Sequence, residues 1–180
     1  MLPVQADTMA AEQPAVITVR LVDYADPGDA QALVQLLDGY ARDAAGGGQP
    51  LPEHVLQGLP AALLQRSQAF SVLAWAQQEG AAPVPVGLVN CFEGFSTFAC
   101  QPLVNVHDVV VAPGWRGQRI AQRMLALVET IAGERGACKL TLEVLSGNTS
   151  AMALYLREGF APYALDPAMG QAQFLQKKLL

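Results

Sequence analysis

Apolar and polar positions follow two different periods along this chain. Five segments are strand-like: the first alternates apolar and polar residues as a half-buried strand does, whereas the other four are largely apolar, and the last of them predicts a buried strand. These segments are residues 17–22, 69–77, 84–95, 103–111 and 138–145, and residues 174–180 alternate enough for a last strand. Apolar residues at intervals of three and four predict helices over residues 26–43, 52–65, about 118–134 and 148–160.

The order of these segments predicts a mixed α/β fold, β-α-α-β-β-β-α-β-α-β. Asp26-Pro27 is a helix start, whereas Gly58 and Pro60 break or kink the second helix. A short Gly- and Pro-containing turn makes residues 69–77 and 84–95 an antiparallel hairpin. The helix between residues 103–111 and 138–145 favours parallel pairing of those two strands.

Composition fits one domain of ordinary size. The chain has 180 residues, 52% of them hydrophobic, so we expect one domain over residues 16–180 after a flexible tail, residues 1–15. The formal charge of -5 argues against nucleic acid as a partner, and no hydrophobic run is long enough to span a membrane. Three cysteines without ligand spacing predict buried reduced thiols, no metal site and a cytoplasmic location.

The stretch VVVAPGWRGQRIA, residues 109–121, passes from a buried strand through a Pro-Gly turn into a helix start. The first helical turn carries unpaired N–H groups and the positive end of the helix dipole, and it attracts anions such as phosphate. An ordinary strand-to-helix turn with two solvated arginines explains the same residues. A second motif is needed to decide between the two interpretations.

That second motif is N-x-x-A-x-x-L-Y-x-x-x-G-F, which residues 148–160 match in full. With Arg116 and Ala121 of the first motif, it resembles the GCN5-related N-acetyltransferase family. Arg119 stands where the family has glycine. The resemblance implies a GNAT fold, acetyl-CoA as cosubstrate and an amine as acetyl acceptor.

The resemblance also implies which residues hold acetyl-CoA. The strand backbone would face the pantetheine arm and the acetyl carbonyl, the helix start would cradle the pyrophosphate, and Asn148 would contact the arm, although a helix N-cap explains Asn148 nearly as well. The residues implied are Val109, Val110, Val111, Arg116, Gly117, Gln118, Arg119, Ile120, Ala121, Asn148 and Tyr155.

Catalysis by direct attack of the amine needs a general acid and a general base. Tyr155 resembles the family's acid, which protonates the departing thiolate; a core tyrosine is the alternative. His107 and Asp108 are the candidates for the base, and strand alternation predicts that only one of them faces the cleft. Glu143 is a weaker candidate.

The acceptor is the least defined part of the prediction. NVHDVVV is similar to a strand of diamine and polyamine acetyltransferases, with His107 in place of their glutamate. This likeness suggests a polyamine, diamine or amino-acid-like acceptor, and Glu93, Tyr40 and Glu53 are candidates for an amine pocket. An acyl-CoA sensor without turnover and a protein lysine or N-terminal acetyltransferase are the alternatives, and a homodimer is expected from relatives.

Overall fold

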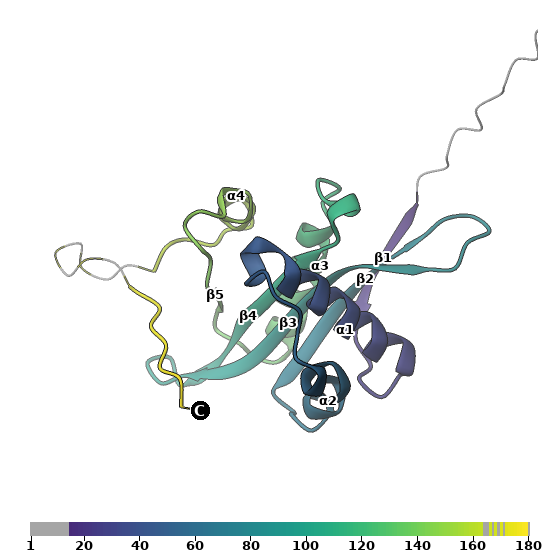
Figure 1. Cartoon of the computed structure of the whole chain (residues 1–180). Helices are drawn as coiled ribbons and strands as arrows, with labels where there is room; N and C mark the ends of the chain where they lie inside the picture. The colour runs from purple at the N-terminus through teal and green to yellow at the C-terminus, as the bar shows by residue number, and fades with distance from the viewer. Residues whose placement is uncertain (1–14, 164–165, 167, 169, 171, 180) are drawn as a thin grey trace, which may run out of the picture.

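A computed structural model describes residues 15–163, 166, 168, 170 and 172–179. Five strands and four helices make a mixed α/β fold, which confirms the predicted class (Figure 1). The strands are β1 (Val16–Leu21), β2 (Ala69–Gln77), β3 (Val84–Ser96), β4 (Gln101–Val111) and β5 (Leu140–Leu142). The helices are α1 (Pro27–Arg42), α2 (Glu53–Leu64), α3 (Ile120–Glu134) and α4 (Thr149–Arg157), with short 3-10 turns at Ala44–Gly46 and Pro113–Trp115.

The five strands form one sheet in the order β1-β2-β3-β4-β5. The first four are antiparallel neighbours, whereas β5 runs parallel to β4. The predicted hairpin and the predicted parallel pair are therefore both confirmed. Pairing between β4 and β5 covers only Val104–Val106 on the β4 side, so β4 continues for five residues beyond its last partner on β5.

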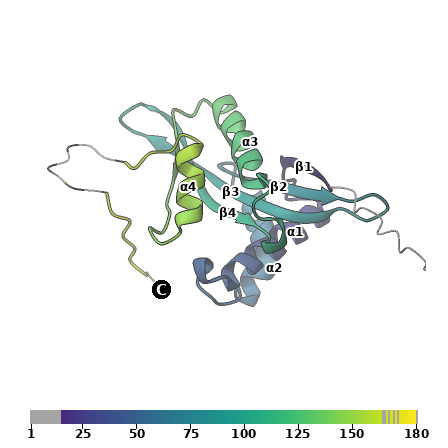
Figure 2. The same ribbon diagram turned by 90° about the horizontal axis from the view of Figure 1, so that it is seen from above.

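Helices cover both faces of the sheet. Figure 2 shows α3 and α4 on one face and α1 and α2 on the other. Met124 and Val128 of α3 are fully buried in a hydrophobic core between α3 and the sheet, the α3 core. Leu33 of α1 is fully buried in a second core on the other face, so both helices turn their apolar stripe to the sheet.

The start of α1 is fixed by two carboxylates. Asp26 caps the helix by accepting a hydrogen bond from the Asp29 N–H at 2.8 Å, and Pro27 follows it, as predicted. Asp29 itself is 1% exposed and forms a bidentate ion pair with Arg20 of β1, at 2.5 and 2.6 Å. This pair joins α1 to the edge strand. The second helix, by contrast, continues as one α-helix through Gly58 and Pro60.

Three predictions are wrong in part: a strand at the C-terminal end, a buried strand over residues 138–145, and buried cysteines. Residues 174–179 form no strand, and Phe174 and Leu179 are 77% and 86% exposed, because no neighbouring surface buries the alternate residues; Leu180 lies outside the described residues. β5 is a short, half-buried strand at the sheet edge. Cys91 is buried, but Cys100 and Cys138 are exposed.

The expected tail over residues 1–15 falls almost wholly outside the described residues. Across the described part of the chain, no helix combines the length and the hydrophobicity that crossing a membrane requires.

Candidate active site

A bulge in β4 turns two neighbouring polar residues to one face of the sheet. Asn90 pairs with Asp108 and the adjacent Cys91 pairs with Val106, so His107 is an extra residue between them. Val106 and Val109 both face the α3 core, which leaves His107 and Asp108 together on the face of α1. The prediction that only one of the two faces this side is wrong, because the bulge interrupts strand alternation.

The bulge lies where β4 parts from β5. The last residue of β4 paired with β5 is Val106, immediately before His107. From Val109 to Val111 the strand still pairs with β3, so half of its backbone groups are used there and the other half point toward the opened edge. This part of β4 therefore has backbone hydrogen-bonding groups along its open edge. That these valines bind acetyl-CoA stays a prediction.

The chain then enters a short loop with two left-handed residues. Gly117 has φ of 80° and Arg119, the residue just before α3, has φ of 59°. The left-handed region favours glycine, which explains why the motif has glycine at the position of Arg119. Arg119 adopts this conformation in spite of its side chain, so the N–H groups of the first turn of α3 keep the arrangement that suits a phosphate.

Arg116 connects this loop to its surroundings. Its Nε donates to the Val111 carbonyl at 3.1 Å, and its guanidinium pairs with Asp43 just after α1 at 3.0 Å. The same guanidinium lowers the pKa of Asp43. In this structure Arg116 thus holds the loop against β4 and the end of α1.

Two tyrosines line the same region from opposite sides. Tyr155 of α4 is 8% exposed and contacts Phe160 edge to face, with ring centroids 5.8 Å apart. Burial, and then the neighbouring Tyr40, raises the pKa of Tyr155 to about 12. Burial, and then Asp108, raises the pKa of Tyr40 on α1. Tyr40 is therefore within electrostatic range of both Asp108 and Tyr155.

The comparisons with known proteins agree with this arrangement. Residues 30–160 match the profile of the acetyltransferase (GNAT) family. The chain belongs to this family. The prediction of a GNAT acetyltransferase is confirmed.

Individual relatives and structural neighbours of this GNAT chain include named acetyltransferases. It is 37% identical over 91 residues to a streptothricin acetyltransferase of Streptomyces lavendulae, which covers 49% of the chain and 48% of that protein, so the match spans about half the length of the curated relative. An aminoglycoside acetyltransferase from an uncultured soil metagenomic sample superposes with a TM-score of 0.69, at 15% identity and over 91% of this chain and 97% of that one. An aminoglycoside N-acetyltransferase in complex with CoA superposes with a TM-score of 0.66, at 16% identity and over 94% of this chain and 99% of that one.

The remaining predicted residues of the GNAT site have other partners. Asn148 caps α4, accepting from the Ala151 N–H at 3.2 Å, so its N-cap role is observed. Glu143 accepts from Asn105 at 3.2 Å on the exposed sheet edge. Glu53 accepts from Gln57 one turn further along α2.

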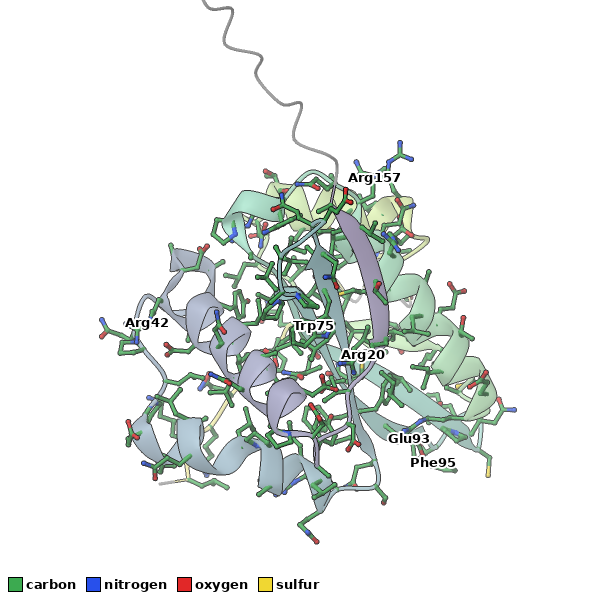
Figure 3. The ribbon with its side chains drawn as sticks, turned by 90° about the vertical axis from the view of Figure 1, so that its right-hand side faces the viewer. Arg20, Arg42, Trp75, Glu93, Phe95 and Arg157 are labelled. Atoms are coloured by element: carbon green, nitrogen blue, oxygen red, sulfur yellow. The ribbon has the colours of Figure 1, made fainter. Side chains whose placement is uncertain are left out.

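Glu93 does not lie on the face of the sheet that carries Asp108. Its carboxylate lies 3.4 Å from Arg135 at the end of α3, and Arg135 also covers the ring of Phe70, a residue of the α3 core. Figure 3 places Glu93 beside Phe95, far from Arg42 at the end of α1. The sheet therefore separates Glu93 from Asp108, and the predicted part in an amine pocket is wrong for this residue.

Sequence reasoning missed the buried polar residues beside Asp108. Ser71 and Asn90 are 1% and 4% exposed in otherwise apolar strands. Asn90 donates to Asp108 Oδ2 at 2.9 Å, and Ser71 donates to Asn90 Oδ1 at 2.6 Å. A single polar residue inside an apolar strand was the available signal, because a buried polar group needs a partner.

Proposed function

We propose that this GNAT protein transfers the acetyl group of acetyl-CoA to a primary amine of a small cationic molecule by direct attack. The observation that carries the proposal is the opened edge of β4 beside Asp108, at the point where β4 parts from β5, with Tyr40 within electrostatic range of both Asp108 and Tyr155. A polar acceptor side and a backbone-lined cofactor side adjoin there.

Acetyl-CoA would be held chiefly by backbone groups. The opened edge of Val109–Val111 suits the pantetheine arm, and the N–H groups from Gly117 to Ala121 suit the pyrophosphate at the start of α3. The thioester of this cosubstrate supplies the activated acetyl group. Arg116 would keep the loop in position through its bond to Val111.

Asp108 is the preferred general base. It is half-buried, its carboxylate is anchored by Asn90, and it lies on the α1 face, where an amine would enter. His107 shares that face, but it is exposed and packs edge to face on Phe92, with centroids 5.5 Å apart. The amine would lose its proton to Asp108 as its nitrogen attacks the thioester carbonyl.

Tyr155 is the general acid of this proposal. Its pKa of about 12 keeps the phenol protonated at neutral pH, so the proton is present when the thiolate leaves. The amine nitrogen gains the acetyl group, the C–S bond breaks and the sulfur takes the phenolic proton. No covalent enzyme intermediate is required.

The acceptor class is a cationic amine. A streptothricin acetyltransferase among the relatives and aminoglycoside acetyltransferases among the structural neighbours support antibiotics of these kinds, and a polyamine, diamine or amino-acid-like amine belongs to the same chemical class. The formal charge of -5 favours such acceptors. A homodimer and a cytoplasmic location stay predictions.

The test is amine-dependent release of the CoA thiol from acetyl-CoA. Streptothricin, aminoglycosides, polyamines, lysine and lysine peptides would be compared at equal concentration, with Asp108→Asn as the control variant. Release with one class of small amine, lost in the variant, supports the proposal. Release with peptides alone, or binding of acetyl-CoA without release by any acceptor, would overturn it in favour of a protein acetyltransferase or a sensor.

A further inference from the structure

A continuous row of polar side chains crosses three strands beneath α1. Ser71 of β2 lies opposite Asn90 of β3, and Asn90 lies opposite Asp108 of β4. Tyr24, in the connection between β1 and α1, extends the row, with its hydroxyl 2.7 Å from the Ser71 hydroxyl. All four side chains lie on the face covered by α1, between the leucines and valines of its core.

The hydrogen bonds of this row have one consistent direction. An ionised Asp108 can only accept, so the Asn90 amide must present its NH₂ to Asp108 Oδ2 and its oxygen to Ser71. Ser71 then uses its only hydrogen on Asn90, and Tyr24 must donate to the Ser71 oxygen. Burial raises the pKa of Tyr24, which keeps that donor protonated. Every donor in the row thus points toward Asp108.

The row ends at Asp108, next to the irregular part of β4. The bulge at His107 interrupts the regular ladder next to Asp108, and pairing with β5 has already ended. The side-chain bond from Asn90 adds a restraint on the Asp108 carboxylate beside this irregularity. Because Asn90 binds Oδ2, Oδ1 is the oxygen left to take the proton from an amine.

We propose that Asn90, backed by Ser71 and Tyr24, is a positioning residue that holds the Asp108 carboxylate in the orientation needed to deprotonate the acceptor amine. The inference rests on the proposed function, since it gives Asp108 the part of general base. Asn90 contacts neither substrate, and it acts only through Asp108. Its loss should therefore lower kcat without changing the affinity for acetyl-CoA.

The decisive experiment is a double-mutant cycle between Asn90 and Asp108. Asn90→Leu keeps the number and branching of the side-chain heavy atoms but removes both hydrogen bonds, and we expect kcat to fall about 10- to 100-fold with the KM for acetyl-CoA unchanged. In the Asp108→Asn background the same substitution should change kcat less than about twofold, because the carboxylate it positions is already gone. Equal losses in both backgrounds would overturn the positioning role.

Two gentler variants cover the case in which Asn90→Leu does not fold. Ser71→Ala frees the amide of Asn90, and Tyr24→Phe removes only the terminal hydroxyl, so kcat should fall about fivefold and about twofold respectively. The matched control is Asn105→Ala on β4, which breaks a part-buried bond to Thr141 and an exposed bond to Glu143 instead. If this control lowers kcat as much as Ser71→Ala, the row is merely structural and the proposal is overturned.

The outcomes separate this inference from the function on which it rests. Wild-type turnover that falls in Asp108→Asn, combined with additive losses in the cycle, would overturn the role of Asn90 alone. Wild-type protein that binds acetyl-CoA yet acetylates no amine would overturn both. Non-additive losses of kcat with unchanged acetyl-CoA affinity support the proposal that this row of side chains orients the Asp108 carboxylate.

Discussion

The cofactor side and the acceptor side proposed for this protein are built in different ways. Residues 109–121 form the cofactor side as one continuous stretch of strand, turn and helix start, and mainly offer backbone groups. The acceptor side gathers the side chains of Tyr24, Tyr40, Asn90 and Asp108 from four separate parts of the chain. A site made of contiguous backbone can be found from a motif, whereas a site made of converging side chains depends on the fold.

The largest expected effect is on the acceptor side. Asp108→Asn should lower kcat about 10³-fold, because the attacking amine loses its proton acceptor, and should leave the binding of acetyl-CoA unchanged. Steady-state kinetics and calorimetric titration would separate the two quantities. His107→Gln is the matched control, with an expected change in kcat below about threefold. The reverse ranking of these two variants would assign the base to His107.

Tyr155→Phe should act where the two sides meet. We expect kcat to fall about 10²-fold at neutral pH, because the thiolate leaves without its proton donor. Acetyl-CoA affinity should change little. Wild-type turnover in this variant across the pH range would exclude Tyr155 as the general acid.

The raised pKa of Tyr155 also predicts a change of stability with pH. The folded-state pKa of about 12 lies above the ordinary 10.0, so the stabilisation is complete below pH 10 and is lost as pH rises toward 12. From about pH 9.5 to 11, the unfolding free energy of the wild type should fall more steeply than that of Tyr155→Phe. Denaturant titrations at each pH measure this slope. Parallel curves would show that burial does not perturb the phenol.

Loosening α1 should affect the acceptor side alone. Asp29→Asn breaks the buried pair with Arg20 and should cost about 3 kcal/mol of unfolding free energy. Amine KM should rise, while the affinity for acetyl-CoA stays the same. Arg42→Gln, which removes an exposed pair with Asp38 on the same helix, should have a much smaller effect. Loss of acetyl-CoA binding in Asp29→Asn would break the distinction between the two sides.

Arg116 contacts both the proposed cofactor side and the end of α1, and its substitution should have a smaller effect on binding. Arg116→Ala should weaken acetyl-CoA binding about tenfold, because the loop loses its bond to the Val111 carbonyl. Asp43→Asn removes only the exposed ion pair and should change the affinity less than about twofold. Equal weakening in both variants would mean that α1 controls the cofactor loop, and the two sides could no longer be treated as separate.

The smallest effect concerns Arg119. Its φ of 59° is unfavourable for a side chain, so Arg119→Gly should stabilise the fold by about 0.5 kcal/mol after the entropy of glycine is subtracted. Gln118→Gly, one residue earlier, should destabilise it by about the same amount. Thermal unfolding compares the two variants. The same sign for both would mean that Arg119 is not strained.

The sequence by itself determined most of the elements and pointed to the proposed cofactor side. Hydrophobic periodicity predicted the four helices and five of the strands, since each period needs only neighbouring residues. Both motifs are short and contiguous, so the sequence alone is enough to indicate the family. The prediction of a strand over residues 174–180 was wrong, because an alternating pattern does not show whether a neighbouring surface is present to bury its apolar residues.

Only the tertiary structure decided the arrangement of the acceptor side. The bulge that turns His107 and Asp108 to one face arises from the register between β3 and β4, and no local pattern encodes that register. Glu93 was placed on the wrong side because its partner, Arg135, comes from a distant helix. Asn90 and Ser71 gained their meaning when three strands aligned them with Asp108. Side chains far apart in sequence meet only through the packing of the whole sheet, and that packing is a property of the fold.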